Sequence, residues 1–399
     1  MERQQVDVLV SGGGVAGLTA AAAFGAAGFS VICVDPAPPV TEETARDADI
    51  RTTAFLQPSV AVLEAAGLWS RLRPHAAPLQ VMRIIDAGGA EPVARLTRDF
   101  DAADVSDQPF GWNLPNWLLR REMVARLGEL PTVTFCPGVG TAGVTARGDA
   151  ALVRLSDGRQ VAARLLVAAD GRNSAVRQAL GIGARTIRYG QKAVVLAVTH
   201  PEPHRNVSTE IHRSGGPFTL VPLPDREGLP ASAIVWMERG AEAERLAALP
   251  VPEFEAAMTE RSCGILGPLT LASRRAVWPI IGQIADRLTA PHTALIAEAA
   301  HVVPPIGAQG LNMSLADLRA LIDLATETPE ALGSAAMLAA YDKRRHLDVQ
   351  MRVRGIDLLN RASMLAPQPL RDLRAGLLGA LYGVAPVRRA LMRAGLGLR

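Results

Sequence analysis

The stretch VDVLVSGGGVAGLTAAAAFGAAGFSVICVD, residues 6–35, contains no charged side chain from Ser11 to Val34. This length would suffice to span a bilayer, which requires about 20 apolar residues. However, the stretch divides into a short strand, a glycine turn, an alanine-rich helix and a second strand that ends at Asp35. No basic segment leads into it, as a signal peptide would require. The order therefore predicts a buried strand–helix–strand unit.

Three glycines follow the first strand of this unit with G-x-G-x-x-G spacing: Gly12, Gly14 and Gly17. Between a strand and a helix, this spacing predicts a dinucleotide site. Gly12 would permit the tight turn, Gly14 would let the backbone approach a pyrophosphate, and Gly17 would let the helix pack closely on the sheet. The pyrophosphate would lie at the helix N-terminus, and Asp35 is placed to accept hydrogen bonds from a ribose.

Composition narrows the class of protein. The chain has 399 residues, of which 49% are apolar and 20% charged, as expected for a soluble globular protein with more than one domain. A net charge of +3 argues against a nucleic-acid partner. The three cysteines have no CxxC spacing, so we expect neither a disulfide framework nor a metal site, and a cytoplasmic location fits.

Two later segments repeat the pattern of an apolar strand that leads to an acidic residue. The first ends at Asp170-Gly171, with Ser174 and Arg177 at the start of an expected helix. The second is AEAAHVVPPIGAQGLN, residues 297–312, where the acid is followed by a loop rich in Pro and Gly and then by a helix. Further strand ends that face a nucleotide are unusual for a simple NAD dehydrogenase.

With these motifs in this order, the chain resembles the flavoprotein aromatic hydroxylases built like para-hydroxybenzoate hydroxylase, and within them the UbiH family of ubiquinone-biosynthesis hydroxylases. The resemblance covers nearly the whole chain. It implies FAD as the cofactor, and NADPH or NADH as a transient electron donor. The residues that it implies for FAD binding are Gly12, Gly14, Gly17, Asp35, Arg51, Asp170, Gly171, Glu298, Pro305, Gly307, Gly310, Leu311 and Asn312.

The third motif departs from the family pattern, which usually has Gly-Asp-Ala-Ala-His, then Pro and Gly-Gln-Gly-x-Asn. Here Ala297 and Glu298 replace the first two residues. Glu298 keeps a carboxylate one methylene further out, and Ala297 adds a methyl group where backbone and cofactor meet. A helix that begins near Gly310 would direct its first N–H groups at the pyrimidine edge of the flavin. His301 is a weak candidate for a catalytic base, and ordering of the loop is the favoured role.

Residues 189–279 predict an antiparallel sheet without helical crossovers, to which strands within residues 79–110 would be added. In the family this sheet roofs the active site. We expect Leu220 and Pro222 to line the substrate pocket together with Pro305. Three tryptophans are candidates for the same lining, although ordinary packing is favoured for each: Trp112, Trp117 and Trp236.

The predicted fold class is α/β: a Rossmann-like FAD-binding domain, an inserted antiparallel sheet domain for the substrate, and a C-terminal helical region. We assign residues 1–78, 111–188 and 280–330 to the first, 79–110 and 189–279 to the second, and 331–399 to the third. The end of the chain carries Arg371, Arg374, Arg388, Arg389, Arg393 and Arg399 against Asp372. This pattern is typical either of helices on an anionic membrane surface or of a helical cover with a solvated face.

The resemblance implies an FAD-dependent monooxygenase that hydroxylates a polyprenylated phenol, or quinone precursor, in ubiquinone biosynthesis. The enzyme would use dioxygen and react through a flavin hydroperoxide. It would also contact a membrane peripherally and associate with a ubiquinone-biosynthesis protein complex. One alternative is an FAD hydroxylase of a free small aromatic compound, for which Arg213 is a candidate cation. Another is a flavin-binding or flavin-free scaffold subunit of such a complex.

Overall fold

The computed structural model describes residues 4–89, 91, 93–213, 215–365 and 367–397. Its N-terminal part surrounds an eight-stranded sheet, the main sheet, in which β1 pairs in parallel with β2 and β11. The strands of its principal path are β18 (Thr289–Ala290), β19 (Thr293–Leu295), β11 (Gln160–Ala168), β1 (Gln4–Ser11), β2 (Val31–Asp35) and β8 (Val133–Pro137). The hairpin of β9 (Thr141–Arg147) and β10 (Ala150–Leu155) is attached to β11.

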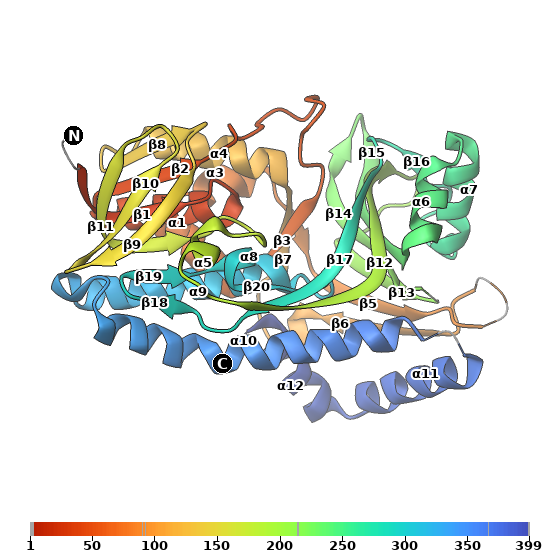
Figure 1. The fold of residues 1–399 in the computed structure, drawn as a ribbon. Coiled ribbons are helices and arrows are strands. Elements are labelled where there is room, and N and C mark those ends of the chain that lie inside the picture. Colours follow the sequence, from red (N-terminus) through yellow and green to blue (C-terminus); the bar gives the residue numbers. More distant parts are fainter. Residues whose placement is uncertain (1–3, 90, 92, 214, 366, 398–399) are drawn as a thin grey trace.

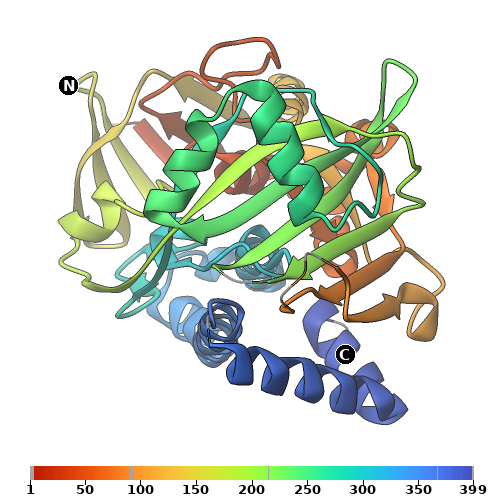
Figure 2. The ribbon, with the colours of Figure 1, turned by 90° about the vertical axis from the view of Figure 1, so that its right-hand side faces the viewer.

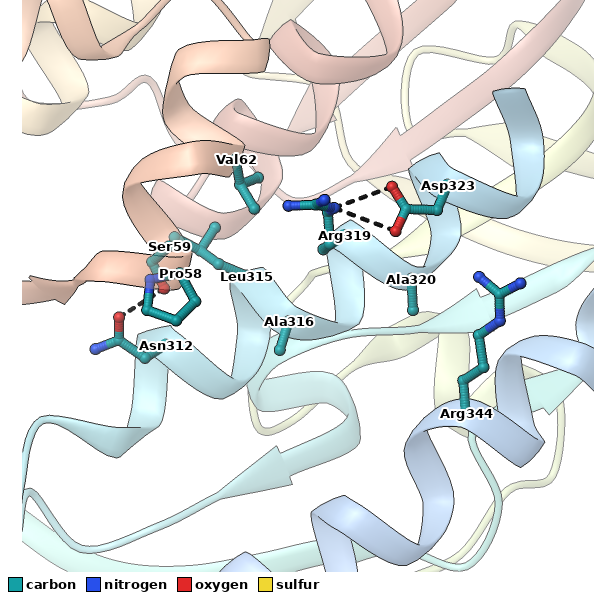
Figure 3. A pocket seen from close by; sticks show the side chains of 10 residues that line it. All are labelled: Pro58, Ser59, Val62, Asn312, Leu315, Ala316, Arg319, Ala320, Asp323 and Arg344. Carbon is teal, nitrogen blue, oxygen red and sulfur yellow. Dashed lines mark hydrogen bonds and ion pairs between the residues drawn. The ribbon is translucent and has the colours of Figure 1, made fainter. Parts of the chain in front are cut away.

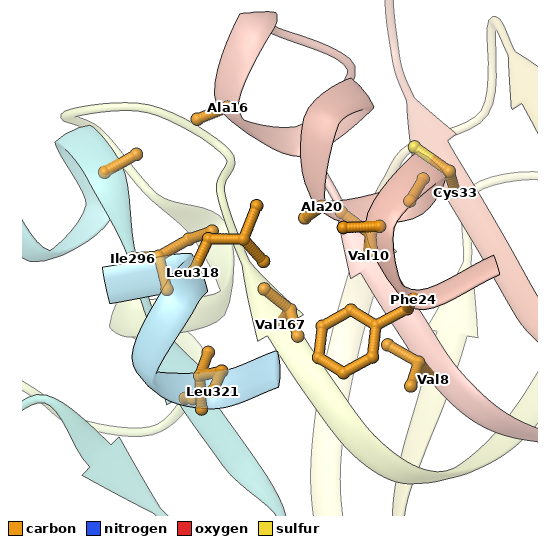
Figure 4. Close-up of a cluster of buried hydrophobic side chains, with 14 of the residues drawn as sticks. Val8, Val10, Ala16, Ala20, Phe24, Cys33, Val167, Ile296, Leu318 and Leu321 are labelled. Carbon is orange, nitrogen blue, oxygen red and sulfur yellow. The ribbon is translucent and has the colours of Figure 1, made fainter. Parts of the chain in front are cut away.

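Helix α1 (Val15–Ala26) explains the uncharged stretch, because every residue from Ala16 to Gly25 is buried. It packs against α4 (Asn116–Gly128) and α9 (Gln309–Glu327). Figure 4 shows the resulting core, in which α1 meets side chains of the main sheet on one side and of α9 on the other. A helix that is apolar on all sides belongs inside a protein. The predicted buried unit is therefore present.

A second, nine-stranded sheet, the roof sheet, lies beside the main sheet (Figure 1). Its path is β20 (His301–Val302), β17 (Ala276–Ala285), β12 (Ala184–Thr199), β15 (Leu229–Arg239), β14 (Pro217–Arg226), β13 (Val207–His212), β5 (Val81–Asp86) and β6 (Leu96–Asp101), with β16 (Thr270–Leu271) beside β12. The pairing is antiparallel except between β13 and β5. Strands β12 and β17 extend beyond the expected bounds of residues 189–279 and run into the FAD-binding domain.

The roof sheet also carries two helices that the sequence reasoning missed, α6 (Gly240–Ala248) and α7 (Val251–Arg261). Figure 2 shows them across the outer face of the sheet. They bury Leu246, Phe254 and Met258 against large side chains of the strands. The available signals were the spacing of three residues between Ala243 and Leu246 in α6 and of four residues between Phe254 and Met258 in α7.

Smaller elements join the two sheets. A three-stranded sheet consists of β3 (Thr52–Leu56), β7 (Gly111–Pro115) and β4 (Ala77–Leu79). The helices α2 (Gln57–Ala65) and α3 (Trp69–Leu72) lie between β3 and β4 in the chain. The short helix α5 (Ala175–Ala179) begins shortly after Asp170, and the short helix α8 (Ala297–Ala300), which follows β19, contains Glu298 in its first turn. The architecture confirms the predicted α/β class with its inserted sheet.

The C-terminal region is helical and forms the lower edge of the molecule in Figure 1. It contains α10 (Ala335–Ser363), α11 (Gln368–Gly383) and α12 (Ala385–Leu396). Of the arginines predicted here, Arg399 lies outside the described residues. Among the helices that the structure describes, none has both the length and the apolar character needed to cross a bilayer.

Candidate active site

In the glycine loop between β1 and α1, two of the three motif glycines have no room for a Cβ atom, and the third has room. A Cβ atom at Gly12, whose φ is +114°, would lie 2.3 Å from the carbonyl oxygen of Ala169, and one at Gly17 would lie 1.8 Å from the carbonyl oxygen of Gly12. At Gly14 an added Cβ atom would meet no atom within 4 Å. The open side of the loop is therefore at Gly14, where the predicted pyrophosphate would approach.

The polar groups around this loop suit an anion. Helix α1 has neither a side-chain cap nor an acidic residue in its first turn, so its first N–H groups keep their bonding capacity. The backbone N–H of Gly13 donates to Oδ2 of Asp35 at 2.5 Å, which fixes this carboxylate at the end of β2 beside the loop. The residues present thus fit the diphosphate and ribose of a dinucleotide.

The second motif is joined to the third by a buried arginine. Oδ1 of Asp170 accepts a hydrogen bond from Ser174 at 2.5 Å, so this carboxylate orders the turn into α5. Arg177 donates to the carbonyl oxygens of Arg172 at 2.8 Å and Ala299 at 2.9 Å. Burial lowers the pKa of Arg177. Gly171, with φ of +81°, provides the turn between Asp170 and this arginine.

Arg51 and Glu298 lie together at the inner end of the FAD-binding domain. Arg51 forms a two-pronged ion pair with Asp49, at 2.7 and 2.8 Å, and its guanidinium lies 4.3 Å from the ring centre of Trp278. Burial would raise the pKa of Asp49, but the hydrogen bonds and charge of Arg51 lower it overall. Burial would lower the pKa of Arg51, whereas Asp49 and the nearby Glu298 raise it. Both members of the pair therefore stay charged.

The loop before α9 is fixed by Asn312, whose side-chain amide is fully used within the protein. Its oxygen accepts from the backbone N–H of Leu56 at 2.9 Å and from Ser59 at 2.6 Å. Its nitrogen donates to the carbonyl oxygens of Ala54 at 2.8 Å and Ala308 at 2.6 Å. Asn312 thereby ties the start of α9 to β3 and α2. Of the other residues predicted in this loop, Leu311 packs against the core, Gly307 has φ of +60°, and Gly310 is in the first turn of α9.

A cavity of about 300 Å³ lies between this loop and the roof sheet. Its charged lining residues are Arg51, Arg172 and Glu298, all from the FAD-binding domain, and Pro305 also lines it. The roof sheet contributes apolar residues to the lining: Ala193, Val195, Leu196, Ala233, Ile234, Val235, Pro279, Ile280 and Ile281. Trp278, which is 36% exposed, lies at the edge. One side of the cavity is therefore polar and the other apolar.

The structure places Leu220 and Pro222 differently from the sequence expectation. Leu220 packs with Phe218, Trp236 and Phe254 in the core between the roof sheet and its helices. Pro222 points to the same side of β14, because side chains two residues apart share a face. Neither residue lines the cavity described above. The register pairs Thr219 with Val235 and Val221 with Ala233, so the alternate residues of β14 have the cavity-side orientation.

The tryptophans and the cation proposed for the pocket also lie elsewhere. Trp112 packs edge-to-face against Trp69, and Trp236 packs against Phe218. Arg213 pairs with Glu260 of α7 at 3.2 Å, on the helix side of the roof. The missed aromatic residue is Trp278. The sequence signal for the cavity face was the alternation of small and large side chains in ASAIVWM, residues 231–237.

His301 is buried away from the cavity lining, in a cluster of charged residues. Its Nε2 atom lies 2.6 Å from Oδ2 of Asp317, and Oδ1 of Asp317 accepts from Nε of Arg345 at 2.7 Å. Burial would raise the pKa of Asp317, but His301 and Arg345 lower it overall. The contact joins β20 to α9 and α10, which agrees with a role in ordering the flavin loop.

Another pocket, of about 500 Å³, lies between α2 and α9 (Figure 3). Its polar groups already have partners: Arg319 is paired with Asp323 at 3.0 Å, and Asn312 bonds to Ser59. Asn312 is the only predicted site residue among those that line it in the described structure. The cavity beside Arg51 and Glu298 is therefore the candidate active site.

Known proteins share this arrangement. The FAD binding domain family matches residues 5–355. The ubiquinone hydroxylase UbiL of Rhodospirillum rubrum is 33% identical and covers 98% of this chain and 89% of its own length. The 3-demethoxyubiquinol 3-hydroxylase of Escherichia coli is 27% identical over the full length of both chains.

Solved structures show the same fold. The Pseudomonas aeruginosa protein PqsL, in complex with 2-aminobenzoylacetate, superposes with a TM-score of 0.78 at 24% identity, over 94% of this chain and all of that one. The p-nitrophenol 4-monooxygenase PnpA of Pseudomonas putida gives 0.78 at 19% identity, over 99% of each chain. The family match spans most of the chain and confirms the resemblance and the FAD cofactor. This protein belongs to the FAD binding domain family as an FAD-dependent monooxygenase of the ubiquinone hydroxylase group.

Proposed function

We propose that the protein hydroxylates the aromatic ring of a polyprenylated phenol, a quinone precursor, in ubiquinone biosynthesis. The observation that carries the proposal is the apolar roof of the cavity. Among the described residues, those that the roof sheet contributes to the lining carry no charged side chain. Such a wall suits a ring with alkyl substituents, since a buried carboxylate would need a cation there. The names of the relatives UbiL and 3-demethoxyubiquinol 3-hydroxylase support a quinone precursor.

The chain's own residues would hold the cofactor and exclude water. The first N–H groups of α1 would bind the diphosphate beside Gly14, and Asp35 would bind the ribose. Arg51 and Glu298 would contact the middle part of the cofactor, and the start of α9 would face the flavin. When bound, FAD supplies the activation of dioxygen. The roof residues would orient the ring over it and keep solvent away. NADPH or NADH would reduce the cofactor in a transient encounter.

The alternative substrate, a free small aromatic acid, gains no support from Arg213, because this cation pairs with Glu260 beyond the roof. The test uses the purified flavin-containing protein with NADPH or NADH and dioxygen. A farnesyl-substituted phenol and 4-hydroxybenzoate are compared as substrates, and product is detected as incorporation of one oxygen atom from ¹⁸O₂. We expect turnover of the prenylated phenol only. Faster turnover of 4-hydroxybenzoate, or no hydroxylation of either compound, would contradict the proposal.

The assignment of the cavity can be tested with a matched pair of variants on the roof sheet. Ala233→Leu would fill the cavity, because Ala233 lines it. We expect product formation to fall at least about tenfold, since overpacking costs about 1–3 kcal/mol, while the bound FAD is retained. Leu220→Met is the control, because it conserves volume on the opposite face of the sheet. Equal loss in both variants would show that the fold, not the cavity, had been disturbed.

A chromosomal deletion tests the biosynthetic role separately. Lipids are extracted from the deletion strain, and the accumulated precursor is identified by mass. We expect a prenylated phenol that lacks one hydroxyl group. Unchanged ubiquinone would remove the proposed role even if the purified enzyme hydroxylates phenols.

A further inference from the structure

The charge of the chain is divided unevenly between its two parts. Residues 331–399 contain twelve Lys and Arg against four Asp and no Glu, a net charge of +8. Residues 1–330 contain 30 basic and 35 acidic residues, a net charge of −5. Such asymmetry indicates an anionic partner for the basic part. The basic part is the layer of helices α10 to α12 along one edge of the molecule (Figure 1).

The same layer carries most of the exposed large apolar side chains among the described residues. Nine of fourteen belong to it: Leu347, Met351, Leu358, Leu359, Leu370, Leu373, Val384, Val387 and Leu391. Single exposed apolar residues are normal, but their concentration on one edge marks an interaction surface.

Helix α10 carries both exposed apolar and exposed cationic side chains on one face. Leu347, Met351 and Leu358 are 64%, 57% and 69% exposed and are spaced by four and seven residues, so they lie on one face. The cations Lys343, Arg354 and Arg361 are exposed on the same helix. They fall three or four residues from these apolar positions, so they continue the same face. We name these six residues the α10 stripe; it spans about 27 Å at 1.5 Å per residue.

The opposite face of α10 is already occupied. Val349, Val353 and Ile356 are buried in a cluster with residues of β12 and β17 of the roof sheet. Helix α10 therefore holds its place in the fold through this inner face. The stripe remains as an outward surface that is apolar and cationic together, which is the composition of helices that lie in the interface of an anionic bilayer.

We propose that the α10 stripe docks the protein laterally on an anionic lipid bilayer. The long cationic side chains would reach the lipid headgroups, while the three apolar side chains would enter the boundary of the acyl chains. The occupant is a lipid surface because it supplies negative charge and apolar contact over the whole length of a straight helix.

The position of the stripe relative to the cavity supports this partner, and this step rests on the proposed substrate. Arg352 of α10 donates to Oε1 of Gln309 at 2.8 Å, and Gln309 donates to the carbonyl oxygen of Gly395 in α12 at 3.1 Å. Helices α10 and α12 thus both contact Gln309 at the start of α9. Leu396 packs in an apolar cluster with Leu56 of β3 and Val221 of β14.

That apolar cluster adjoins the candidate active site. Thr52, at the other end of β3 from Leu56, lines the cavity, and Val221 pairs with Ala233 of the cavity roof. The end of α12 is therefore connected to the cavity lining through β3 and β14. On this side, a polyprenyl tail would reach the site while the remainder of the lipid stays in the bilayer.

The test is sedimentation of the full-length, FAD-loaded protein with vesicles of phosphatidylcholine alone or with 30% phosphatidylglycerol. We expect binding to the anionic vesicles that weakens in 0.5 M salt. The variant Leu347→Gln/Met351→Gln/Leu358→Gln should lose at least about tenfold in vesicle affinity. The variant Lys343→Gln/Arg354→Gln/Arg361→Gln should lose about 100-fold, because it removes three cations from the anionic surface.

Two controls carry substitutions of the same kind elsewhere on the surface. Leu229→Gln/Val251→Gln removes exposed apolar groups of the roof domain, and Arg159→Gln/Arg205→Gln/Arg287→Gln removes three exposed cations. Both should bind vesicles like the wild type. Absence of binding to anionic vesicles, or an equal loss in a control and a stripe variant, would overturn the proposal.

A second copy of the chain is the competing occupant of the stripe. If light scattering shows a dimer that the stripe variants convert to a monomer, without any vesicle binding, the surface is a dimer interface and the lipid proposal is wrong. No substrate enters these measurements, so failure of the proposed reaction leaves them unaffected. Retained FAD and an unchanged midpoint of thermal unfolding would show that the stripe variants are folded.

Discussion

The two loops that would enclose the ends of FAD are fixed by different forces. The loop of residues 12–17 is held by close backbone contact, since added Cβ atoms at Gly12 and Gly17 would overlap backbone atoms. The loop of residues 297–312 is held by hydrogen bonds of Asn312 and by the buried charges of His301, Asp317 and Arg345.

This difference explains which glycine positions of the two motifs are occupied by alanine in this chain. Ala297 and Ala308 both have φ of +55°, a left-handed conformation that favours glycine. Ala308 also stands where the family pattern Gly-Gln-Gly has its first glycine. A left-handed alanine costs about 1–2 kcal/mol and leaves the backbone in place. The overlaps at Gly12 and Gly17 would move the backbone itself. At these four positions, the two glycines required by space are kept in this chain, whereas the two required only by conformation are replaced.

The largest effect is expected where the flavin loop depends on charge. In Asp317→Asn, Arg345 and His301 lose a buried carboxylate that accepts from both, and we expect a loss of about 3 kcal/mol in the free energy of unfolding. The pKa of Asp317 is lowered in the folded state. Its charge therefore stabilises the fold above its ordinary pKa near 4 and ceases to do so as the pH falls through the folded pKa.

Urea unfolding at pH 7 and pH 3 measures this prediction. The difference in stability between wild type and Asp317→Asn should be full at pH 7 and smaller at pH 3. Asp323→Asn is the control on the same helix, because its surface ion pair with Arg319 should contribute at most about 1 kcal/mol. A difference that is the same at both pH values would mean that charge does not hold this loop.

The glycine loop provides an effect of similar size, through two nearby substitutions with different consequences. Gly17→Ala forces a Cβ atom against the carbonyl oxygen of Gly12, and we expect a loss of about 3 kcal/mol in the stability of the FAD-free protein. Gly14→Ala has room and a φ of −73°, so stability should stay within about 0.5 kcal/mol.

The affinity for FAD should also be changed by Gly14→Ala, although this substitution leaves the stability of the protein almost unchanged. The methyl group of Gly14→Ala would occupy the side from which the diphosphate approaches, so the dissociation constant of FAD should rise at least about tenfold. Fluorescence titration of the FAD-free protein measures it. Normal FAD affinity in Gly14→Ala would show that the diphosphate does not lie at this open position.

Much of the fold followed from local patterns in the sequence. The uncharged stretch up to Asp35 predicts a buried unit because its period changes from strand to helix and back, and the structure buries α1 on every side. Likewise, Asp170 precedes the short helix α5, and Glu298 lies in the first turn of the short helix α8. Such signals depend on neighbours in the chain, so they survive without knowledge of the tertiary structure.

The remaining features depend on contacts between distant segments. The facing of β14 is set by the helices α6 and α7, which place Leu220 in the core instead of the cavity. The partners of His301 come from residues 317 and 345, and the pairing of β13 with β5 joins segments more than 100 residues apart. No periodicity within one segment determines which of its faces meets a particular partner.

The smallest effect is expected from substitutions that test the left-handed backbone conformation of Ala297 and Ala308. Ala297→Gly should relieve a left-handed cost of about 1–2 kcal/mol, but glycine also makes the unfolded chain more flexible by about 0.4–1 kcal/mol. The expected net result is a gain of about 0.5–1 kcal/mol in the free energy of unfolding, and Ala308→Gly should behave alike. Ala299→Gly, in the same short segment but without positive φ, is the control and should destabilise the protein. If all three substitutions destabilise the protein equally, backbone conformation is not what distinguishes the two alanines, and they would have to be explained by contact with the cofactor.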